Sequence, residues 1–391
     1  MKKIVFILSL LVSIPVFCGA QNPKTRKGDP DKSIKSNKEA IHPVKKTESD
    51  GFLGLARITK NWGYIDKSGR TVIDFQFSDA KSFSDGYARV KKMNSWGFID
   101  SRGSIVINPQ FGRAEDFSEG MARVYKFKKW GYIEKSGTFS INPQFDEAED
   151  FAGGVARVKK GLVWGLIDAK GLFVVNPQFK ELGPFADGLA RARVGKQWGY
   201  VNKSGKWEIN PQFDNAEDFF GGLARVRKGV KWGFIDKSGS FVITPQFEAL
   251  GDFHEKLARA KNMKQWGYID KAGTWAVNPQ FNDAGDFDEG FAKVRKGEQW
   301  GYIETAGTYS INPQFQAAEN FSNGMARVRL GSQWGFISKK GAFVINPQFN
   351  VANDFQNGFA LVRKGNKWGF INANGEIVIN FQYSDADSFS K

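Results

Sequence analysis

The sequence predicts an all-β protein built as an open repeat array, or superhelix, of ten three-stranded β-meander units. The first observation is a Trp-Gly pair whose Trp returns every 34 residues. The second is a set of short period-two apolar patterns separated by Gly-containing turns, and the third is a Pro-containing segment that follows them in most units. A fixed period of this size is typical of solenoids, propellers and linear arrays, in which each unit buries its apolar face against its neighbours. The ten tryptophans are Trp62, Trp96, Trp130, Trp164, Trp198, Trp232, Trp266, Trp300, Trp334 and Trp368.

A β-propeller-like arrangement, as one large ring or two five-bladed rings, stays open as the alternative. Propellers usually have about four to eight blades, so ten uninterrupted units favour the open array. The first and last units also differ from the rest, because Phe75 and Phe381 replace the Pro of the Asn-Pro-Gln-Phe segment. Atypical end units are expected where an array is capped.

Within one unit the period-two patterns predict three short strands, at 224–227, 232–236 and 241–243. The first turn, at Lys228-Gly229, and the second, at 236–239, each contain a Gly that can adopt the positive φ of a tight hairpin.

The Asn-Pro-Gln-Phe segment predicts the end of the meander, since Pro cannot donate to a ladder of hydrogen bonds. The apolar spacing of three between 145 and 151 predicts a single helical turn or an irregular link to the next unit.

The Trp-Gly pair, the Asp-Lys-Ser-Gly turn and the Phe/Tyr-rich second half of each unit resemble the bacterial WG repeat, also called the KWG repeat. The resemblance covers residues 51–391. It implies a non-catalytic interaction module and names no partner.

The N-terminus predicts export. Met1-Lys2-Lys3 and an apolar run to Phe17 are typical of a signal peptide, here 1–20 with cleavage after Ala20. The expected location is the periplasm, the outer surface or the medium. A lipoprotein modified on Cys18 is the alternative, although bulky Phe17 stands where such a site needs a small residue.

Residues 21–50 hold many charges and few aliphatic residues, which predicts a disordered linker. The WG-repeat array is therefore expected to occupy 51–391.

Three recurrent side-chain rows each have a structural and a functional interpretation. Gln stands 14 residues after every Trp, from Gln76 to Gln382, as a buried bridge or as a ladder of ligand-facing amides. An Arg follows Ala in most first strands and is expected to pair with a carboxylate or stack on an aromatic ring. Trp207 and Trp275 lie in a row of aromatic residues, which favours core packing over a sugar-binding platform.

The sequence predicts neither an enzyme nor a cofactor or metal site. Cleavage after Ala20 removes the only Cys, and His254, interpreted as a solvated loop residue, is the only His outside the linker. Seven of the ten Trp residues are followed four residues later by an Asp or Glu, which lacks a second ligand at metal spacing and is interpreted as a turn former.

The charge pattern gives the most specific functional hypothesis. The formal net charge is +15, and the first hairpin turn is basic in nearly every unit. Stacked units would align these turns into a positive rim, expected to bind a protein or an anionic polymer of the cell envelope. A solubilising edge is the alternative interpretation. The residues of this basic rim are Lys91, Lys92, Lys128, Lys129, Lys159, Lys160, Arg227, Lys228, Lys261, Lys264, Arg295 and Lys296.

These observations predict an exported, monomeric, non-catalytic scaffold. Export argues against nucleic acid as the partner. The alternative is an enzyme or a carbohydrate-binding protein whose site lies in a variable loop.

Overall fold

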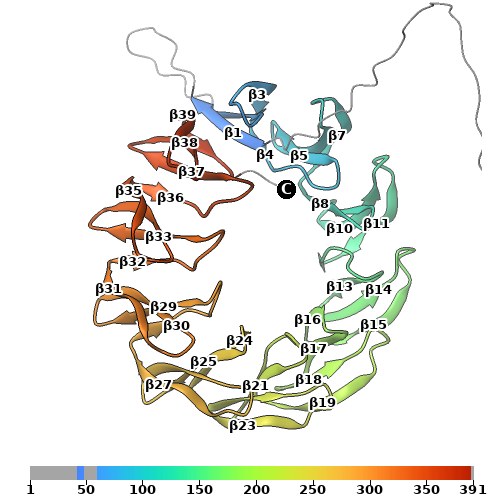
Figure 1. The fold of residues 1–391 in the computed structure, drawn as a ribbon. Helices are drawn as coiled ribbons and strands as arrows, with labels where there is room; N and C mark the ends of the chain where they lie inside the picture. Colours follow the sequence, from blue (N-terminus) through green and yellow to red (C-terminus); the bar gives the residue numbers. More distant parts are fainter. Residues whose placement is uncertain (1–41, 48–59, 389–391) are drawn as a thin grey trace, which may run out of the picture. The chain divides into compact units, whose positions relative to one another are not determined.

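The computed structural model describes residues 42–47 and 60–388. The expected signal peptide and Cys18 lie outside these residues. The described chain is all β, as the sequence predicts, and it consists of ten four-stranded antiparallel sheets that follow one another along the sequence (Figure 1). No helix in this part of the chain is long and apolar enough to cross a membrane.

Nine of the ten sheets contain the three predicted strands, and the first sheet takes its first strand from residues 42–47. The strand that carries the Trp-Gly pair is central, and we call it the Trp-Gly strand. These strands are β2 (Lys60–Ile65), β6 (Ser95–Asp100), β10 (Lys129–Glu134), β14 (Val163–Ile167), β18 (Gln197–Val201), β22 (Lys231–Ile235), β26 (Gln265–Ile269), β30 (Gln299–Glu304), β34 (Gln333–Ser338) and β38 (Lys367–Asn372).

On one side the Trp-Gly strand pairs with the strand before it, which we call the first strand. The first strands are β1 (His42–Thr47), β5 (Tyr87–Lys92), β9 (Met121–Lys126), β13 (Ala156–Lys160), β17 (Leu189–Val194), β21 (Ala224–Lys228), β25 (Leu257–Asn262), β29 (Phe291–Lys296), β33 (Met325–Leu330) and β37 (Phe359–Lys364).

On its other side it pairs with the strand after it, which forms one edge of the sheet and which we call the edge strand. The edge strands are β3 (Thr71–Phe77), β7 (Ile105–Phe111), β11 (Phe139–Phe145), β15 (Phe173–Phe179), β19 (Trp207–Phe213), β23 (Phe241–Phe247), β27 (Trp275–Phe281), β31 (Tyr309–Phe315), β35 (Phe343–Phe349) and β39 (Ile377–Tyr383).

A fourth strand, which the sequence pattern did not predict, completes each sheet beside the first strand. It comes from the link between units, so the predicted helical turn is wrong. These linking strands are β4 (Asp79–Ala80), β8 (Arg113–Ser118), β12 (Glu147–Ala148), β16 (Glu181–Ala186), β20 (Asn215–Ala216), β24 (Ala249–His254), β28 (Asp283–Ala284), β32 (Ala317–Ala318), β36 (Val351–Ala352) and β40 (Asp385–Ala386).

The edge strand continues through the Pro that was expected to end it. In the sheet of β23, Trp232 pairs with Phe247, and Phe234 pairs with Ile243. A step of two residues along the Trp-Gly strand therefore matches a step of four residues along the edge strand. This bulge takes Pro245 out of the ladder, and an edge strand tolerates a residue without an N–H.

The same bulge explains the Gly of the Trp-Gly pair. A Cβ on Gly199 would lie 2.7 Å from the backbone nitrogen of Pro211 and 2.8 Å from the carbonyl carbon of Asn210, and it would also overlap the carbonyl oxygen of Ile209. The bulged edge strand therefore approaches the Trp-Gly strand too closely for any side chain there.

The core lies between neighbouring sheets. One cluster joins Tyr200, Ile209 and Phe213 of one sheet to Val226 and Ile235 of the next, and equivalent clusters occupy the other junctions. Aromatic rings also meet edge to face across the junctions, as Phe213 and Phe241 do at 6.2 Å. Each unit thus buries its apolar residues against its neighbours, as the 34-residue period predicts.

The last unit contacts the first. Ile65 belongs to a buried cluster with Phe370 and Ile379, and β1 pairs with β40. The all-β array of ten repeats is confirmed, and these contacts add a pairing between its first and last units. β1 lies inside the stretch 21–50 that the sequence assigns to a linker, and it takes the place of a first strand in the sheet of β2 and β3.

Candidate functional site

The twelve residues of the basic rim all lie at or beside the turns between a first strand and the following Trp-Gly strand. We call these the rim turns. Because antiparallel neighbours run in opposite directions, the rim turns lie at one end of the Trp-Gly strands and the Asp-Lys-Ser-Gly turns at the other. The structure therefore places the predicted residues at equivalent turns of six units, the second to fourth and the sixth to eighth, and it divides them into two groups.

The first group is held against the protein. Five residues pair across the hairpin with the Trp and place their charged groups over its ring at 5.7–5.9 Å. They are the half-buried Lys91, Lys159, Arg227, Lys261 and Arg295. Lys129 belongs here too, because its ammonium group forms an ion pair with Asp146. Cation–π contacts of this kind stabilise the half-buried Trp rings.

The second group is exposed. Among the described residues none of its ammonium groups is within ion-pair distance of a carboxylate. These six residues, which we call the exposed rim lysines, are Lys92, Lys128, Lys160, Lys228, Lys264 and Lys296.

A side chain from the preceding link fixes each of several rim turns. The amide of Gly161 donates to the Asp146 carboxylate at 2.8 Å, and Gly229 donates to Asp214 at 2.6 Å. The hydrogen bonds from Lys129 and from the Gly161 amide lower the pKa of Asp146. The rim turns are thus held in a defined geometry, although these carboxylates reduce part of the positive charge near them.

Sequence reasoning missed the apolar members of the rim turns. Met93, Phe127, Leu162, Val230 and Met263 lie at the tips beside the exposed rim lysines, and all five are strongly exposed. The sequence could have revealed them, because large apolar residues stand here at turn positions where other units carry Gly, Ser, Asn, Lys or Glu.

Neighbouring rim turns enclose a groove. A pocket of about 610 Å³ is lined by Leu162 from one rim turn, by Val194 and Gly195 from the next, and by Lys159 and Lys180. These two neighbouring rim turns therefore line one groove that combines apolar and basic side chains.

The Arg that follows Ala forms a second row, which joins each unit to the next. Arg225 donates from Nη1 to the Leu250 carbonyl at 2.7 Å and from Nε to Asp252 at 2.8 Å. Equivalent bonds recur with the period of the repeat, and the same side chains lie over the Trp rings, as Arg191 does over Trp198 at 5.4 Å. Both parts of the structural interpretation are confirmed. This row is the Arg ladder: Arg89, Arg123, Arg157, Arg191, Arg225, Arg259, Lys293 and Arg327.

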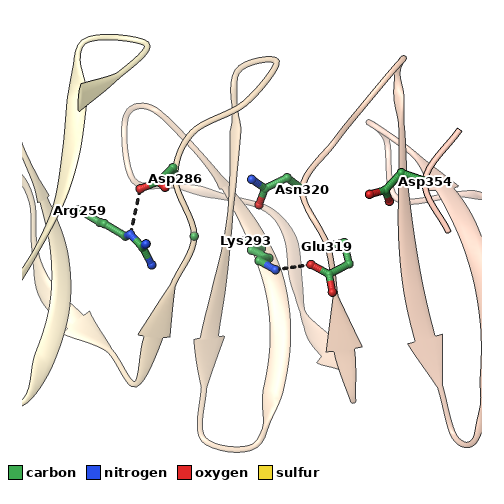
Figure 2. Close-up of a pocket in the computed structure, with 7 residues that line it drawn as sticks. Arg259, Asp286, Lys293, Glu319, Asn320 and Asp354 are labelled. Atoms are coloured by element: carbon green, nitrogen blue, oxygen red, sulfur yellow. Dashed lines mark hydrogen bonds and ion pairs between the residues drawn. The ribbon is translucent and has the colours of Figure 1, made fainter. Parts of the chain in front are cut away.

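Figure 2 shows the ladder at a pocket of about 370 Å³. Arg259 pairs with Asp286 at 2.9 Å, and Lys293 pairs with Glu319 at 2.6 Å. Each cation in this pocket has a carboxylate partner, so its charge is largely compensated within the protein.

The structure also tests the interpretations of the Gln row, the aromatic row and the turn-forming Asp residues. The Gln row is exposed in nearly all units, as at Gln110 and Gln144, so the buried bridge is wrong: these residues alternate with the buried Phe on the edge strand. Trp207 packs edge to face on Phe179 at 5.6 Å, which confirms the core interpretation. Asp236 accepts the amides of Ser238 and Ser240, as a turn former does.

His254 and its surroundings differ from expectation. It lies in β24, half-buried, where its ring stacks on Phe220 at 5.3 Å. Within 42–47 and 60–388 no group of three or more His, Cys, Asp or Glu side chains is placed to hold a metal ion.

Comparison with known proteins gives one family and several distant folds. The model of the WG containing repeat matches residues 62–94, 96–129, 130–161, 164–198, 198–232, 232–262, 266–300, 300–334, 334–368 and 368–391. No curated protein matches the sequence.

Among solved structures, a crystal structure of the eukaryotic initiation factor is similar at a TM-score of 0.51 with 8% identity, covering 89% of this chain and 98% of that one. The extracellular domain of a putative hybrid two-component system from B. thetaiotaomicron has a TM-score of 0.30 with 7% identity, covering 79% and 56%. Dihydro-heme d1 dehydrogenase NirN has a TM-score of 0.36 with 9% identity, covering 89% and 74%. The first likeness supports the fold alone.

Proposed function

Since the chain belongs to the WG-repeat family through ten consecutive repeats, we propose that it is an exported, non-catalytic scaffold that binds an anionic polymer of the cell envelope through its basic rim. The observation that carries this proposal is the set of six exposed rim lysines, which recur at equivalent turns.

The distribution of charge favours the rim over the Arg ladder. Most ladder cations pair with a carboxylate of the next unit, whereas the exposed rim lysines lie outside ion-pair distance of the described carboxylates. Unneutralised charges that repeat along one surface suit a polymer whose own charges repeat. Each unit would contribute a weak contact, and the contacts would add through avidity.

The alternative is an enzyme or a carbohydrate-binding protein with a site in a variable loop. It predicts binding that depends on sugar structure and changes little with salt. Measuring binding over a series of salt concentrations therefore distinguishes the two proposals.

Dextran sulfate is the test polymer, and uncharged dextran of the same length is its control. We expect the mature protein to bind dextran sulfate at low salt and to lose affinity at least about tenfold as NaCl approaches physiological ionic strength, because exposed charges are screened over about 8 Å there. Binding is measured by fluorescence anisotropy of labelled polymer.

Uncharged dextran should not bind at any salt concentration. Equal binding of both polymers, or an affinity for dextran sulfate that does not change with salt, would contradict the proposal and favour a sugar-specific site.

A further inference from the structure

The rim turns carry the most exposed large apolar side chains among the described residues. Their exposed fractions are 80–87%, whereas the next most exposed, Leu172, reaches 64%. These five residues, which we call the apolar tips, are Met93 (87%), Phe127 (81%), Leu162 (84%), Val230 (80%) and Met263 (83%). Exposed apolar side chains are ordinary when they are scattered, but here they all occur at one kind of turn.

Three of the apolar tips occupy an unfavourable backbone conformation. Met93, Phe127 and Met263 have φ values of 56°, 55° and 47°, a left-handed conformation that large side chains rarely adopt. The corresponding position is Gly in the other units with described rim turns, as at Gly229 and Gly297. Backbone strain at an exposed site that buries nothing within the protein points to a role outside folding.

Every apolar tip lies within two residues of an exposed rim lysine. Phe127 and Met263 directly precede Lys128 and Lys264, and Met93 directly follows Lys92. The rim turns therefore present an apolar side chain and an ammonium group together. This pairing of chemistry suits the boundary between the charged headgroups and the acyl chains of an anionic bilayer.

The apolar tips are confined to part of the array. They occur in the second, third, fourth, sixth and seventh units, whereas the last three units carry Glu298, Ser332 and Asn366 at the tip. The groove between the rim turns at Leu162 and Val194 shows that these two turns lie side by side in this part of the array.

We propose that the rim turns of the second to seventh units dock on an anionic lipid surface, with the apolar tips inserted among the lipids and the exposed rim lysines on the headgroups. This inference rests on the proposed function, because the same lysines supply the attraction, and it adds an anionic lipid bilayer to the polymer as a partner of the same rim. A bilayer fits better than a protein, since the tips are separate projections on different hairpins and a protein interface needs a continuous, closely packed area.

The test measures cosedimentation of the full mature protein with vesicles of phosphatidylcholine and phosphatidylglycerol in equal amounts. The tip variant combines M93G, F127G and M263G, which suit the positive φ, with L162S and V230S. Insertion of one large apolar side chain into the lipid should strengthen vesicle binding by about tenfold. The five changes together should therefore lower vesicle affinity at least about a hundredfold. Leu172→Ser, directly after the Asp168-Ala169-Lys170-Gly171 turn at the opposite end of the Trp-Gly strand, is the matched control and should bind as the parent does.

Dextran sulfate separates this inference from the proposed function. The tip variant should bind that polymer as the parent does, because a polymer offers no apolar interior. Undiminished vesicle binding by the tip variant, equal binding of the parent to vesicles of phosphatidylcholine alone, or parent binding to dextran sulfate but not to anionic vesicles would overturn the lipid inference. Failure of the parent to bind either probe at low salt would overturn the proposed function as well.

Discussion

Replacing Phe213 by alanine is expected to lower the free energy of unfolding by about 3–5 kcal/mol. The Phe213 ring is fully buried, and it belongs to the cluster that joins its own sheet to the next one through Val226 and Ile235. Its loss leaves a cavity at the junction between two units, where neighbouring backbones cannot close in freely. Urea unfolding followed by circular dichroism measures the change.

The control is Leu172→Ala, which removes a largely exposed side chain and should change stability by no more than about 0.5 kcal/mol. If Phe213→Ala unfolded at the same urea concentration as this control, the junctions between sheets would not be the source of stability.

Replacing Gly199 by alanine is expected to lower the free energy of unfolding by about 3 kcal/mol, although it adds only a methyl group. The new Cβ would lie 2.7 Å and 2.8 Å from backbone atoms of Pro211 and Asn210 in the bulged edge strand. Backbone atoms within a hydrogen-bonded sheet cannot move aside as the end of a flexible side chain can. Thermal melting of the purified variant measures the loss.

Gly112→Ala is the comparison, since its Cβ would meet only ordinary contacts at 3.6 Å with Tyr125. This variant should melt close to the parent. Equal melting temperatures for Gly199→Ala and Gly112→Ala would show that close approach of the edge strand does not explain the Trp-Gly pair.

The sequence predicted what repeats with the period of one unit. The Trp-Gly strands, the turn at Asp236 and the aromatic row at Trp207 follow from local patterns, so their structural roles could be predicted. The path of the edge strand could not be predicted, because Pro245 ends a strand in most contexts and is tolerated here only by a bulge at a sheet edge. Most linking strands could not be predicted for a similar reason, since seven of the ten contain only two residues and show no period.

Part of the candidate site also could not be predicted from the sequence. The partners of the Arg ladder lie about 25–27 residues further along, on the next sheet, so the geometry of adjacent sheets decides which carboxylate is met. The charge pattern alone also could not show which residues of the basic rim are held against the protein and which are exposed. Lys159 and Lys160 are neighbours in sequence, yet alternation along the strand places one over Trp164 and leaves the other exposed.

This division decides how the basic rim should be tested. Reversing Lys129, Lys159 or Arg227 would remove contacts that hold Asp146 or the Trp rings, so a loss of binding there would be confused with a loss of structure. Exposed rim lysines avoid that difficulty, and the opposite turns supply equally exposed lysines for a control.

The most direct measurement compares two variants with the same change in net charge. One reverses four exposed rim lysines to Glu, and the other reverses four exposed lysines of the opposite turns. The rim set is Lys128, Lys160, Lys228 and Lys264, and the opposite set is Lys170, Lys237, Lys271 and Lys340. Both variants should melt close to the parent, because exposed charges away from partners contribute little to stability.

Affinity for dextran sulfate at low salt is then measured for both variants and the parent. If the rim is the binding surface, its variant loses at least about tenfold in affinity while the opposite variant stays within about threefold of the parent, since a charge acts mainly within a Debye length of its partner. Equal losses in the two variants would mean that net charge alone attracts the polymer, and would contradict a binding site at the rim.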